Sequence, residues 1–249
     1  MTNQASFDFG GTSVLVTGGT SGIGHAVASA FATAGASVTI TGRNASAADY
    51  ERDLSAFAYR QLEMRDRVAV DALGAGLDSL DVLVNNAGAN FPDGKDEWDP
   101  EGFSAALDLN AEGAMRLTVR ARSALAASSM AGGASVVNLV SMTAFRSTTI
   151  VPGYSAAKAA LLSLTRNLAA HWAADGIRVN AVAPGLIDTP MTAPMKAFPE
   201  LLEAELGRAV IRRMGNPEEV AAAVLFLCSE ASSYTTGSVL AVDGGYLAL

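Results

Sequence analysis

The sequence contains little cysteine and histidine: one cysteine, Cys228, and two histidines, His25 and His171. A single cysteine excludes an internal disulfide and favours a protein of the reducing cytoplasm. Two histidines leave little material for a histidine-based zinc site or a Ser-His-Asp triad, so no bound metal is expected. We expect Cys228 to lie in the core, at the end of the apolar stretch 220–227, and neither histidine to carry chemistry.

Long apolar segments and compositionally biased regions are also absent. No apolar run reaches the ~18 residues that a membrane-spanning helix needs, and the first residues lack the basic region and apolar core of a signal peptide. There is no linker rich in Pro, Gly or Ser and no internal repeat, so we expect one domain over residues 1–249. The net charge of −8 argues against nucleic acid as a partner.

Strand-like and helix-like segments alternate along the whole sequence. With 50% hydrophobic and 17% charged residues, the chain has enough apolar side chains to bury strands on both faces, as a parallel sheet requires. The alternation predicts an α/β fold, a doubly wound parallel sheet of about seven strands with helices on both faces. The expected strands are 14–17, 37–41, 57–64, 80–85, 135–140, 178–182 and 239–242.

Three kinds of connection between these strands are expected. The segment 43–56 is short for a crossover helix, so we expect a stunted helix or turn at 47–54, whereas 99–127 and 154–173 read as long helices. The segment 188–213 is rich in methionine and proline, which suits a mobile lid over a substrate. A plain surface connection is the alternative reading of that segment.

A glycine-rich turn, Gly18-Gly-Thr-Ser-Gly22-Ile-Gly24, lies between the first expected strand and a helical pattern that begins at His25. Glycines allow a tight turn and a close backbone approach to a pyrophosphate, and the helix N-terminus supplies free N–H groups and a positive dipole. The spacing differs from the commonest dinucleotide fingerprint, Gly-x-Gly-x-x-Gly. Phosphate binding is therefore weighed against an ordinary tight strand–helix turn.

Tyr154, Lys158 and Ser141 form a candidate proton-transfer group. Tyr154 and Lys158 stand at i and i+4 of an expected helix and so project from the same face. An ammonium near a phenol favours the phenolate, which pulls the tyrosine pKa down from about 10 toward the range of a general acid/base. Ser141 follows an apolar strand, so its hydroxyl is held by backbone and can bind a substrate oxygen. Tyr-x-x-x-Lys alone is a weak pattern, and a surface pair is the alternative.

The chain resembles the short-chain dehydrogenase/reductases in six motifs that occur in the order of that family, over a region from about Gly10 to the end. It is most similar to the branch that includes 3-oxoacyl-carrier-protein reductases and many sugar, steroid and alcohol dehydrogenases. The resemblance implies a Rossmann-like fold. The motifs are Thr17-Gly-x-x-x-Gly-Ile-Gly24, Asn85-Asn-Ala-Gly88, Asn110, Ser141 with Tyr154 and Lys158, Pro184-Gly185 with Thr189, and Val242-Asp-Gly-Gly245.

The resemblance also implies site residues. The catalytic set is Asn110, Ser141, Tyr154 and Lys158, in which the backbone of Asn110 holds a water that joins Lys158 to solvent. Thr189 bonds the nicotinamide carboxamide, and the expected substrate residues are Ser141, Thr143, Phe145, Tyr154 and Met191. The expected cofactor residues are Gly18, Thr20, Ser21, Gly22, Ile23, Gly24, Arg43, Glu63, Met64, Asn86, Ala87, Gly88, Tyr154, Lys158, Pro184, Gly185, Ile187 and Thr189.

Arg43 indicates which dinucleotide is used. The second expected strand ends in Gly42-Arg43, without the acidic residue that would bind the ribose hydroxyls and repel a 2′-phosphate. A guanidinium there can bond the 2′-phosphate and stack on adenine, so NADP(H) is favoured and NAD(H) is the alternative. Glu63-Met64 stands where family members carry Asp and a small apolar residue near adenine, so that contact is expected to be displaced.

These observations predict an NADP(H)-dependent oxidoreductase that interconverts a carbonyl compound and a secondary alcohol, with Tyr154 as the general acid/base. Two alternatives stay open: an NAD(H)-dependent alcohol dehydrogenase of the same family, and a non-catalytic nucleotide-binding protein. The expected partner is a moderately hydrophobic small molecule, and Arg146 meets either a substrate anion or water. The alanine-rich helices predict a homotetramer of two-fold symmetry, with a dimer as the fallback.

Overall fold

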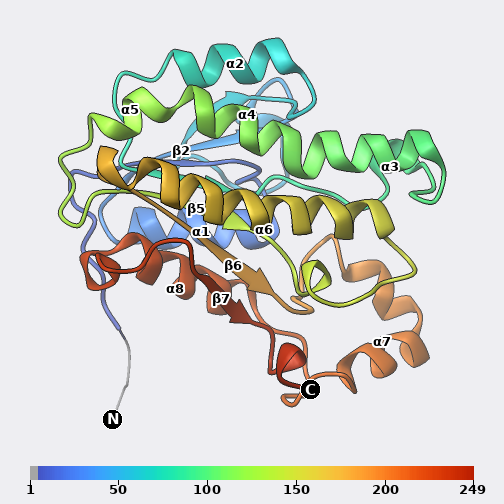
Figure 1. Cartoon of the computed structure of the whole chain (residues 1–249). Coiled ribbons are helices and arrows are strands. Elements are labelled where there is room, and N and C mark those ends of the chain that lie inside the picture. The colour runs from blue at the N-terminus through green and yellow to red at the C-terminus, as the bar shows by residue number, and fades with distance from the viewer. Residues whose placement is uncertain (1–4) are drawn as a thin grey trace.

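Seven parallel strands form one sheet in the order β3-β2-β1-β4-β5-β6-β7, which confirms the predicted doubly wound fold (Figure 1). The computed structural model describes residues 5–249. The inner strands consist largely of β-branched or other apolar residues, as parallel strands buried on both faces require, whereas the edge strand Ala58–Gln61 is mostly exposed. The strands are β1 (Ser13–Val16), β2 (Ser37–Gly42), β3 (Ala58–Gln61), β4 (Val82–Asn85), β5 (Ala134–Leu139), β6 (Ile177–Pro184) and β7 (Val239–Val242).

Alternate residues of the central strands enter two separate cores. Val14 and Val16 of β1 pack in the cluster on one face of the sheet, whereas Leu15 packs in the cluster on the other. β4 repeats the pattern, with Val84 on the first face and Leu83 on the second. Since side chains of a strand point alternately to its two faces, a continuous apolar run is what a sheet covered on both sides needs.

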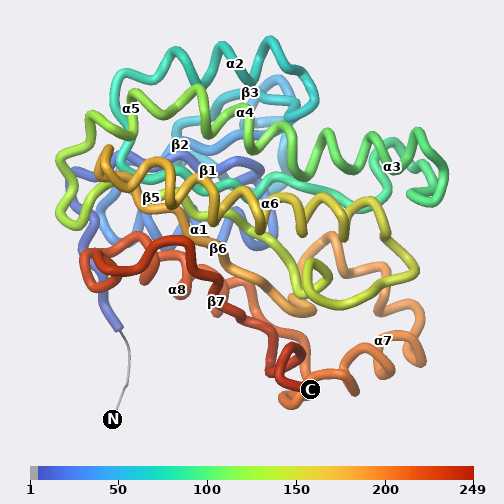
Figure 2. The backbone as a smooth tube through the Cα atoms, viewed as in Figure 1, coloured from blue at the N-terminus to red at the C-terminus, as the bar shows by residue number. Residues whose placement is uncertain are grey.

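Helices cover both faces of the sheet (Figure 1). α1 and α8 pack against each other on one face, and α2, α4 and α6 contribute to the core on the other. α7 lies apart from both layers, beside the end of the chain, as Figure 2 shows. The helices are α1 (Gly22–Thr33), α2 (Arg67–Ala75), α3 (Pro100–Leu107), α4 (Gly113–Arg120), α5 (Arg122–Ala126), α6 (Pro152–Trp172), α7 (Pro199–Leu206) and α8 (Pro217–Cys228).

Two expected elements are shorter or interrupted. The predicted strand 57–64 is reduced to Ala58–Gln61 at the sheet edge, and Asp66 then caps α2 by accepting N–H bonds from Val68 and Ala69, both at 3.0 Å. The predicted helix 99–127 is divided into α3, α4 and α5, with a π-helical turn at Asp108–Glu112. In that turn Gly113 N–H donates to the Asp108 carbonyl, one residue beyond the α-helical partner.

Other expectations are met more closely. The segment after β2 forms only a 3-10 helix, Ala47–Asp49, so the short crossover prediction is confirmed. α6 begins at Pro152, two residues before Tyr154, because proline suits the first helical position. Cys228 is a buried free thiol, as predicted, and burial raises its pKa to about 12. Among residues 5–249, no helix combines the length and apolarity needed to cross a membrane.

Arg178, in β6, bonds the turn before β5, the end of α8 and the segment between α8 and β7. Its side chain is buried, and its guanidinium donates to the carbonyls of Gly132 at 2.9 Å and Leu227 at 2.7 Å and to the Ser232 hydroxyl at 3.0 Å. Burial lowers the pKa of this arginine. Removing the guanidinium would leave the Gly132 carbonyl without its donor and would take one donor from the Leu227 carbonyl, which is costly in a protein interior.

We therefore predict that Arg178→Ala lowers the free energy of unfolding by about 3 kcal/mol. Arg166→Ala is the matched control, because Arg166 is exposed on α6, and it should change stability by less than about 0.5 kcal/mol. Urea denaturation of both variants measures the difference. If Arg178→Ala and Arg166→Ala have the same free energy of unfolding, these segments do not depend on the Arg178 guanidinium.

Candidate active site

The site lies at the carboxyl ends of β1, β4 and β5, next to the point where the strand order reverses. β1 lies between β2 and β4, so the chain first winds from β1 toward one edge of the sheet and then crosses back from β3 to β4 to continue toward the other edge. Such a switch point is where open α/β sheets bind ligands. Thr17 closes the end of β1 onto β4: its N–H donates to the Val84 carbonyl at 3.0 Å, and its hydroxyl accepts from Asn86 N–H and Ala87 N–H, both at 3.0 Å.

The predicted glycine loop packs directly on the Asn86-Ala87-Gly88 segment. Asn86 Nδ2 donates to the carbonyls of Thr17 at 2.9 Å and Gly18 at 3.1 Å. A Cβ on Gly24 would stand 2.3 Å from that Nδ2, and Gly18 has a φ of +64° that favours glycine. Gly18 and Gly24, both predicted to bind cofactor, are therefore also needed for the close approach of the two segments.

The first turn of α1 suits an anion. Its N-cap residue, Ser21, makes no side-chain cap hydrogen bond. The N–H groups of Gly22, Ile23 and Gly24 are the unpaired donors of a helix start, and the helix dipole adds positive potential there. Gly22 also faces Thr189, whose side-chain carbons lie 3.3 Å from where a Gly22 Cβ would stand. The glycine loop and the Thr189 segment thus lie side by side.

Arg43 is exposed at the end of β2, beside the glycine loop. A Cβ on Gly42 would meet the Thr20 methyl group at 2.7 Å and the Tyr50 hydroxyl at 2.4 Å, so Thr20 and the Gly42-Arg43 turn adjoin. The Tyr50 hydroxyl accepts from Asn44 N–H at 3.0 Å, which fixes the turn after Arg43. This role of Tyr50 was not predicted, although a tyrosine in the short segment after β2 could have indicated a side chain that packs on the Arg43 turn.

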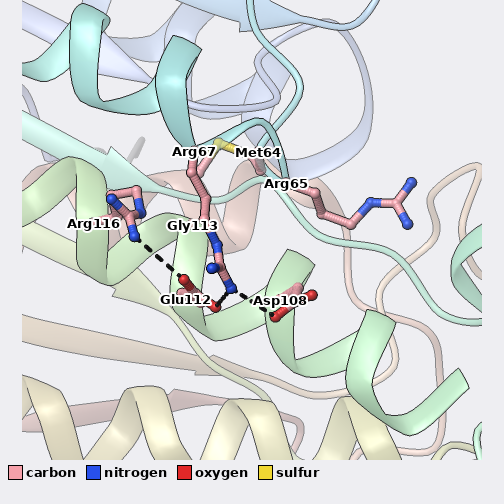
Figure 3. Close-up of a pocket in the computed structure, with 7 residues that line it drawn as sticks. All are labelled: Met64, Arg65, Arg67, Asp108, Glu112, Gly113 and Arg116. Atoms are coloured by element: carbon pink, nitrogen blue, oxygen red, sulfur yellow. Dashed lines mark hydrogen bonds and ion pairs between the residues drawn. The ribbon is translucent and has the colours of Figure 1, made fainter. Parts of the chain in front are cut away.

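Met64 lies beside a cluster of ion pairs (Figure 3). Met64 is buried in the core, and Glu63 lies 3.8 Å from the Arg65 guanidinium. The ion pairs run along the start of α4: Arg67 bonds Glu112 at 2.9 Å, and Arg116 lies 3.5 Å from the same carboxylate. The charged groups of this cluster thus pair with one another.

Ser141, Tyr154 and Lys158 come together as predicted. Lys158 is 3% exposed, its Nζ lies 5.4 Å from the centroid of the Tyr154 ring, and it donates to the Leu139 carbonyl at 2.7 Å. Ser141 is buried just beyond β5, and a hydrogen bond from its hydroxyl to the Tyr154 phenol lowers the pKa of Tyr154. The lysine is thus anchored to the strand that presents the serine.

The electrostatics of the tyrosine differ from the prediction. We expected Lys158 to pull the phenol pKa down, but in the protein chain by itself burial raises the pKa of Tyr154 to about 12. The Ser141 hydrogen bond lowers that pKa and the charge of Glu97 raises it, both by less than burial does. Burial also lowers the pKa of Lys158 to about 8. Tyr154 is therefore held neutral, as a proton donor, beside an ammonium that releases its own proton near neutrality.

Asn110 occupies the π-helical turn and fastens it to the site. Its Nδ2 donates to the carbonyls of Ala89 at 3.0 Å and Ala106 at 2.9 Å, and its Oδ1 accepts from Ala89 N–H at 3.1 Å. The same Oδ1 lies 2.5 Å from where a Gly88 Cβ would stand, and Lys158 Nζ lies 3.6 Å from that point. π-turns often mark functional sites because they redirect backbone groups. The turn brings Asn110, Gly88 and Lys158 together.

Comparisons with known proteins agree with this arrangement. A family model described as Enoyl-(Acyl carrier protein) reductase matches residues 18–247. A cis-4-hydroxycyclohexanecarboxylate dehydrogenase of Sinomonas cyclohexanicum is 40% identical over 94% of this chain and 96% of its own. A galactitol 2-dehydrogenase (L-tagatose-forming) of Cereibacter sphaeroides is 37% identical over 99% of both chains. The structure of a Pseudomonas aeruginosa RhlG/NADP complex superimposes with a TM-score of 0.87 at 32% identity, covering 98% of this chain and 99% of that one.

The chain belongs to the short-chain dehydrogenase/reductase family. The resemblance in the sequence motifs is thereby confirmed, as is the Rossmann-like fold. The chain is accordingly an oxidoreductase of carbonyl and alcohol groups.

The remaining residues of this short-chain dehydrogenase/reductase site lie after β6. Pro184 ends β6, and a Cβ on Gly185 would stand 2.7 Å from the Asp243 Cα, so this turn packs closely on the tail motif. Ile187 is buried, and its carbonyl accepts a bond from the Thr192 hydroxyl at 2.5 Å. Thr189 adjoins the same hydroxyl, with its Oγ1 at 3.3 Å. The Thr189 side chain is thus held next to Gly22 of the glycine loop.

The expected substrate residues fall into two groups. Thr143 donates to the Ser141 hydroxyl from its N–H at 3.2 Å and its Oγ1 at 3.1 Å, a role that the sequence analysis missed. Phe145 and Met191 are exposed apolar side chains, 42% and 44% accessible. Arg146, for which a substrate anion or water was expected, donates to the Leu249 carbonyl instead. Phe145 and Met191 are thus accessible to a substrate, and Thr143 orients the Ser141 hydroxyl.

Proposed function

We propose that this short-chain dehydrogenase/reductase interconverts a carbonyl compound and a secondary alcohol with NADP(H), using Tyr154 as the general acid/base. The observation that carries the proposal is the convergence of Ser141, Tyr154 and Lys158 beside the glycine loop. Lys158 is bonded to the strand that presents Ser141, at 2.7 Å from the Leu139 carbonyl. A phenol held neutral by burial is suited to give its proton to a developing alkoxide.

The hydrogen bonds of Ser141 define its role. Its oxygen accepts two bonds from Thr143, so its own proton is the group that it donates, to the Tyr154 phenol in the chain by itself and to a substrate oxygen when a substrate is bound. In reduction, Ser141 donates to the substrate carbonyl oxygen and Tyr154 transfers its proton to that oxygen. In oxidation, Tyr154 takes the alcohol proton and Ser141 again bonds the oxygen. A bound nicotinamide supplies or accepts the hydride.

Lys158 and Asn110 support the tyrosine. One Lys158 N–H bonds the Leu139 carbonyl, and two N–H donors remain for ribose hydroxyls and water. With its pKa lowered to about 8, Lys158 can exchange a proton near neutral pH and so restore the Tyr154 phenol. Asn110 holds the backbone of Ala89 and Ala106, and its own backbone is the group that we expect to bind a connecting water.

Several groups of the chain are suited to bind a dinucleotide. The close glycine loop, the uncapped start of α1 and the small Asn86-Ala87-Gly88 segment suit a pyrophosphate and two riboses. Arg43 suits the 2′-phosphate, and RhlG from Pseudomonas aeruginosa was crystallised with NADP. The full expected set is Gly18, Thr20, Ser21, Gly22, Ile23, Gly24, Arg43, Glu63, Met64, Asn86, Ala87, Gly88, Tyr154, Lys158, Pro184, Gly185, Ile187 and Thr189.

The segment 188–213 remains our candidate for a lid. None of the residues of α7 is buried, and Phe198 at its start is 62% exposed. Lys196 bonds Asp188 at 2.7 Å across the base of the segment. The exposed side chains of Phe198 and Leu201 suit a substrate with a hydrophobic part. The relatives named for galactitol and cis-4-hydroxycyclohexanecarboxylate give a first substrate panel of polyols and cyclic hydroxy acids.

We predict that Tyr154→Phe lowers turnover by about 10²- to 10⁴-fold, because general acid/base catalysis is typically worth that factor. The ring still packs in place, so NADPH affinity, measured by fluorescence titration, should stay within about two-fold of the wild type. Steady-state kinetics on the most active substrate of the panel test the prediction. A variant that keeps more than about a tenth of the rate would rule out Tyr154 as the proton donor.

We predict that Arg43→Ala weakens NADPH binding by about 10- to 100-fold, the value of a charge-assisted hydrogen bond, and leaves NADH binding almost unchanged. Arg52→Ala, on an exposed arginine of the segment after the Ala47–Asp49 helix, is the control. Equal losses for both cofactors would show that Arg43 does not bind the phosphate. A wild type that prefers NADH would contradict the NADP(H) assignment.

We also propose a homotetramer in the cytoplasm, with α6 and β7 as the contacts between subunits. Ala159 and Ala160 are exposed on α6, and Leu240 of β7 is 37% exposed at the sheet edge. Small residues allow partner helices to approach closely, and an edge strand left uncovered favours pairing. Cys228 is a free buried thiol, which suits a reducing compartment.

For this assembly we predict a light-scattering mass of four times the 25.5 kDa chain. Ala160→Arg should reduce that mass to a dimer or monomer, because a long charged side chain keeps the helices apart. Ala204→Arg, on the exposed α7, should leave the mass unchanged. A wild-type chain that is an active monomer would leave the alanines of α6 as internal packing only.

A further inference from the structure

Glu97 is a fully buried carboxylate that the proposed mechanism does not use. It lies in the connection between β4 and α3 and has 0% exposure. No ion pair among residues 5–249 includes it. Burying a carboxylate without a cation costs several kcal/mol unless hydrogen bonds compensate. Its position therefore calls for a structural reason.

Both oxygens of Glu97 accept backbone hydrogen bonds. Oε2 accepts from Tyr154 N–H at 2.8 Å, and Oε1 accepts from Phe91 N–H at 2.9 Å. The carboxylate is enclosed by the helices: a Cβ on Gly153 would stand 3.3 Å from Oε2 and 2.9 Å from the Ala106 side chain. One side chain thus joins the start of α6 to the loop that carries the Asn86-Ala87-Gly88 segment.

The start of α6 lacks a cap of its own. Val151, the N-cap residue, makes no side-chain cap hydrogen bond, and Pro152 has no N–H. Tyr154 N–H belongs to the first turn, where donors have no partner within the helix. Glu97 supplies the missing acceptor from a distant part of the chain, and the positive end of the helix dipole stabilises its charge.

A second contact beside it strengthens the same junction. The indole N–H of Trp98 donates to the Thr149 carbonyl at 2.9 Å, just before α6. Ser155 donates to the Thr143 carbonyl at 2.6 Å, just after Tyr154. Of these contacts, only the Glu97 bond is made by Tyr154 itself.

We propose that Glu97 is a positioning residue of the proton-transfer site, whose carboxylate fixes the backbone of Tyr154 against the loop that follows β4. The proposal rests on the function proposed for Tyr154. Because misplacing a reacting group by about 1 Å can cost about 10²-fold in rate, a residue that sets this distance matters to turnover without touching the substrate.

The charge of Glu97 gives this role a distinct signature. The groups around Tyr154 are Lys158 on its own helix, the uncharged hydroxyl of Ser141 beyond β5, and Glu97 from the β4–α3 connection, whose carboxylate lies at the Tyr154 backbone N–H and acts on the phenol through its charge. Glu97 raises the pKa of Tyr154, so removing its charge lowers that pKa. Oxidation needs the phenolate, and the rise of its rate with pH should therefore move to lower pH. Reduction needs the phenol, so the fall of the reduction rate at high pH should also move to lower pH.

Three variants separate geometry from charge. Glu97→Gln removes the charge and replaces one acceptor by a donor, so we expect kcat to fall by about 10- to 100-fold and the pH profile to move to lower pH. Glu97→Asp keeps the charge but is one methylene shorter, so kcat should fall while the profile stays in place. Glu101→Gln, on an exposed glutamate of α3, is the control and should change neither. NADPH affinity should be unaffected in all three.

Hydrogen exchange of the amides gives a readout that does not need a substrate. In the wild type, peptides that contain Tyr154 N–H and Phe91 N–H should be protected, and Glu97→Gln and Glu97→Asp should lose protection at these two places before global unfolding. The thermal unfolding of each variant is measured alongside. If Glu97→Gln does not fold, Glu97→Asp still tests the geometry by exchange and kcat.

The outcomes distinguish the two proposals. Wild-type kcat and pH profile in Glu97→Gln, with unchanged exchange at Tyr154, would overturn the role of Glu97 and leave Tyr154 catalysis intact. An active Tyr154→Phe variant, or a wild type inactive on the whole panel, would overturn the proposed function. If the proposed function fails, hydrogen exchange still tests the contact. Unchanged exchange in Glu97→Gln would overturn the hydrogen bond from Tyr154 N–H to Glu97. Lost protection of Tyr154 N–H would show that Glu97 anchors the start of α6 without a role in turnover.

Discussion

The close approach of two backbone segments at the carboxyl edge of the sheet is the constraint on which the rest of the site depends. Asn86, after β4, bonds the carbonyls of Thr17 and Gly18, and Gly24 leaves no room for a Cβ beside it. Parallel strands bring these segments to one edge, and the strand order opens a crevice there. Any side chain at Gly24 would separate the loop from the β4 segment and, with them, the surfaces suited to a dinucleotide.

Burial determines the chemistry of the proton-transfer group. It raises the pKa of Tyr154 to about 12 and lowers that of Lys158 to about 8, so burial favours the neutral form of each. The neighbours then adjust the tyrosine in opposite directions, with Ser141 lowering its pKa and Glu97 raising it. The site thus joins a proton donor to a lysine that exchanges its own proton near neutrality, and the surrounding structure holds both in place through backbone contacts.

Much of the fold was predictable because its signals are local. Apolar runs at β1, β4, β5 and β6 have to be strands of a sheet covered on both faces, and the segment 43–56 was visibly too short for a crossover helix. The break in the helix 99–127 was not predictable. It follows from Asn110, which bonds the Ala89 backbone, and from Gly113, where a Cβ would stand 2.5 Å from the Met64 carbonyl. Both partners lie outside the helix.

The sequence by itself determined the family, the parallel sheet and the identity of the residues that meet at its edge, because motif order and hydrophobic periodicity are properties of the chain alone. Only the tertiary structure decided how those residues act. The predicted low pKa of Tyr154 was wrong for the chain by itself, because burial, which depends on the packing around the phenol, raises that pKa. Thr143 as a donor to Ser141, and Glu97 as the partner of Tyr154 N–H, were likewise hidden, since neither contact has a sequence pattern. Burial and long-range hydrogen bonds exist only once distant segments have been brought together.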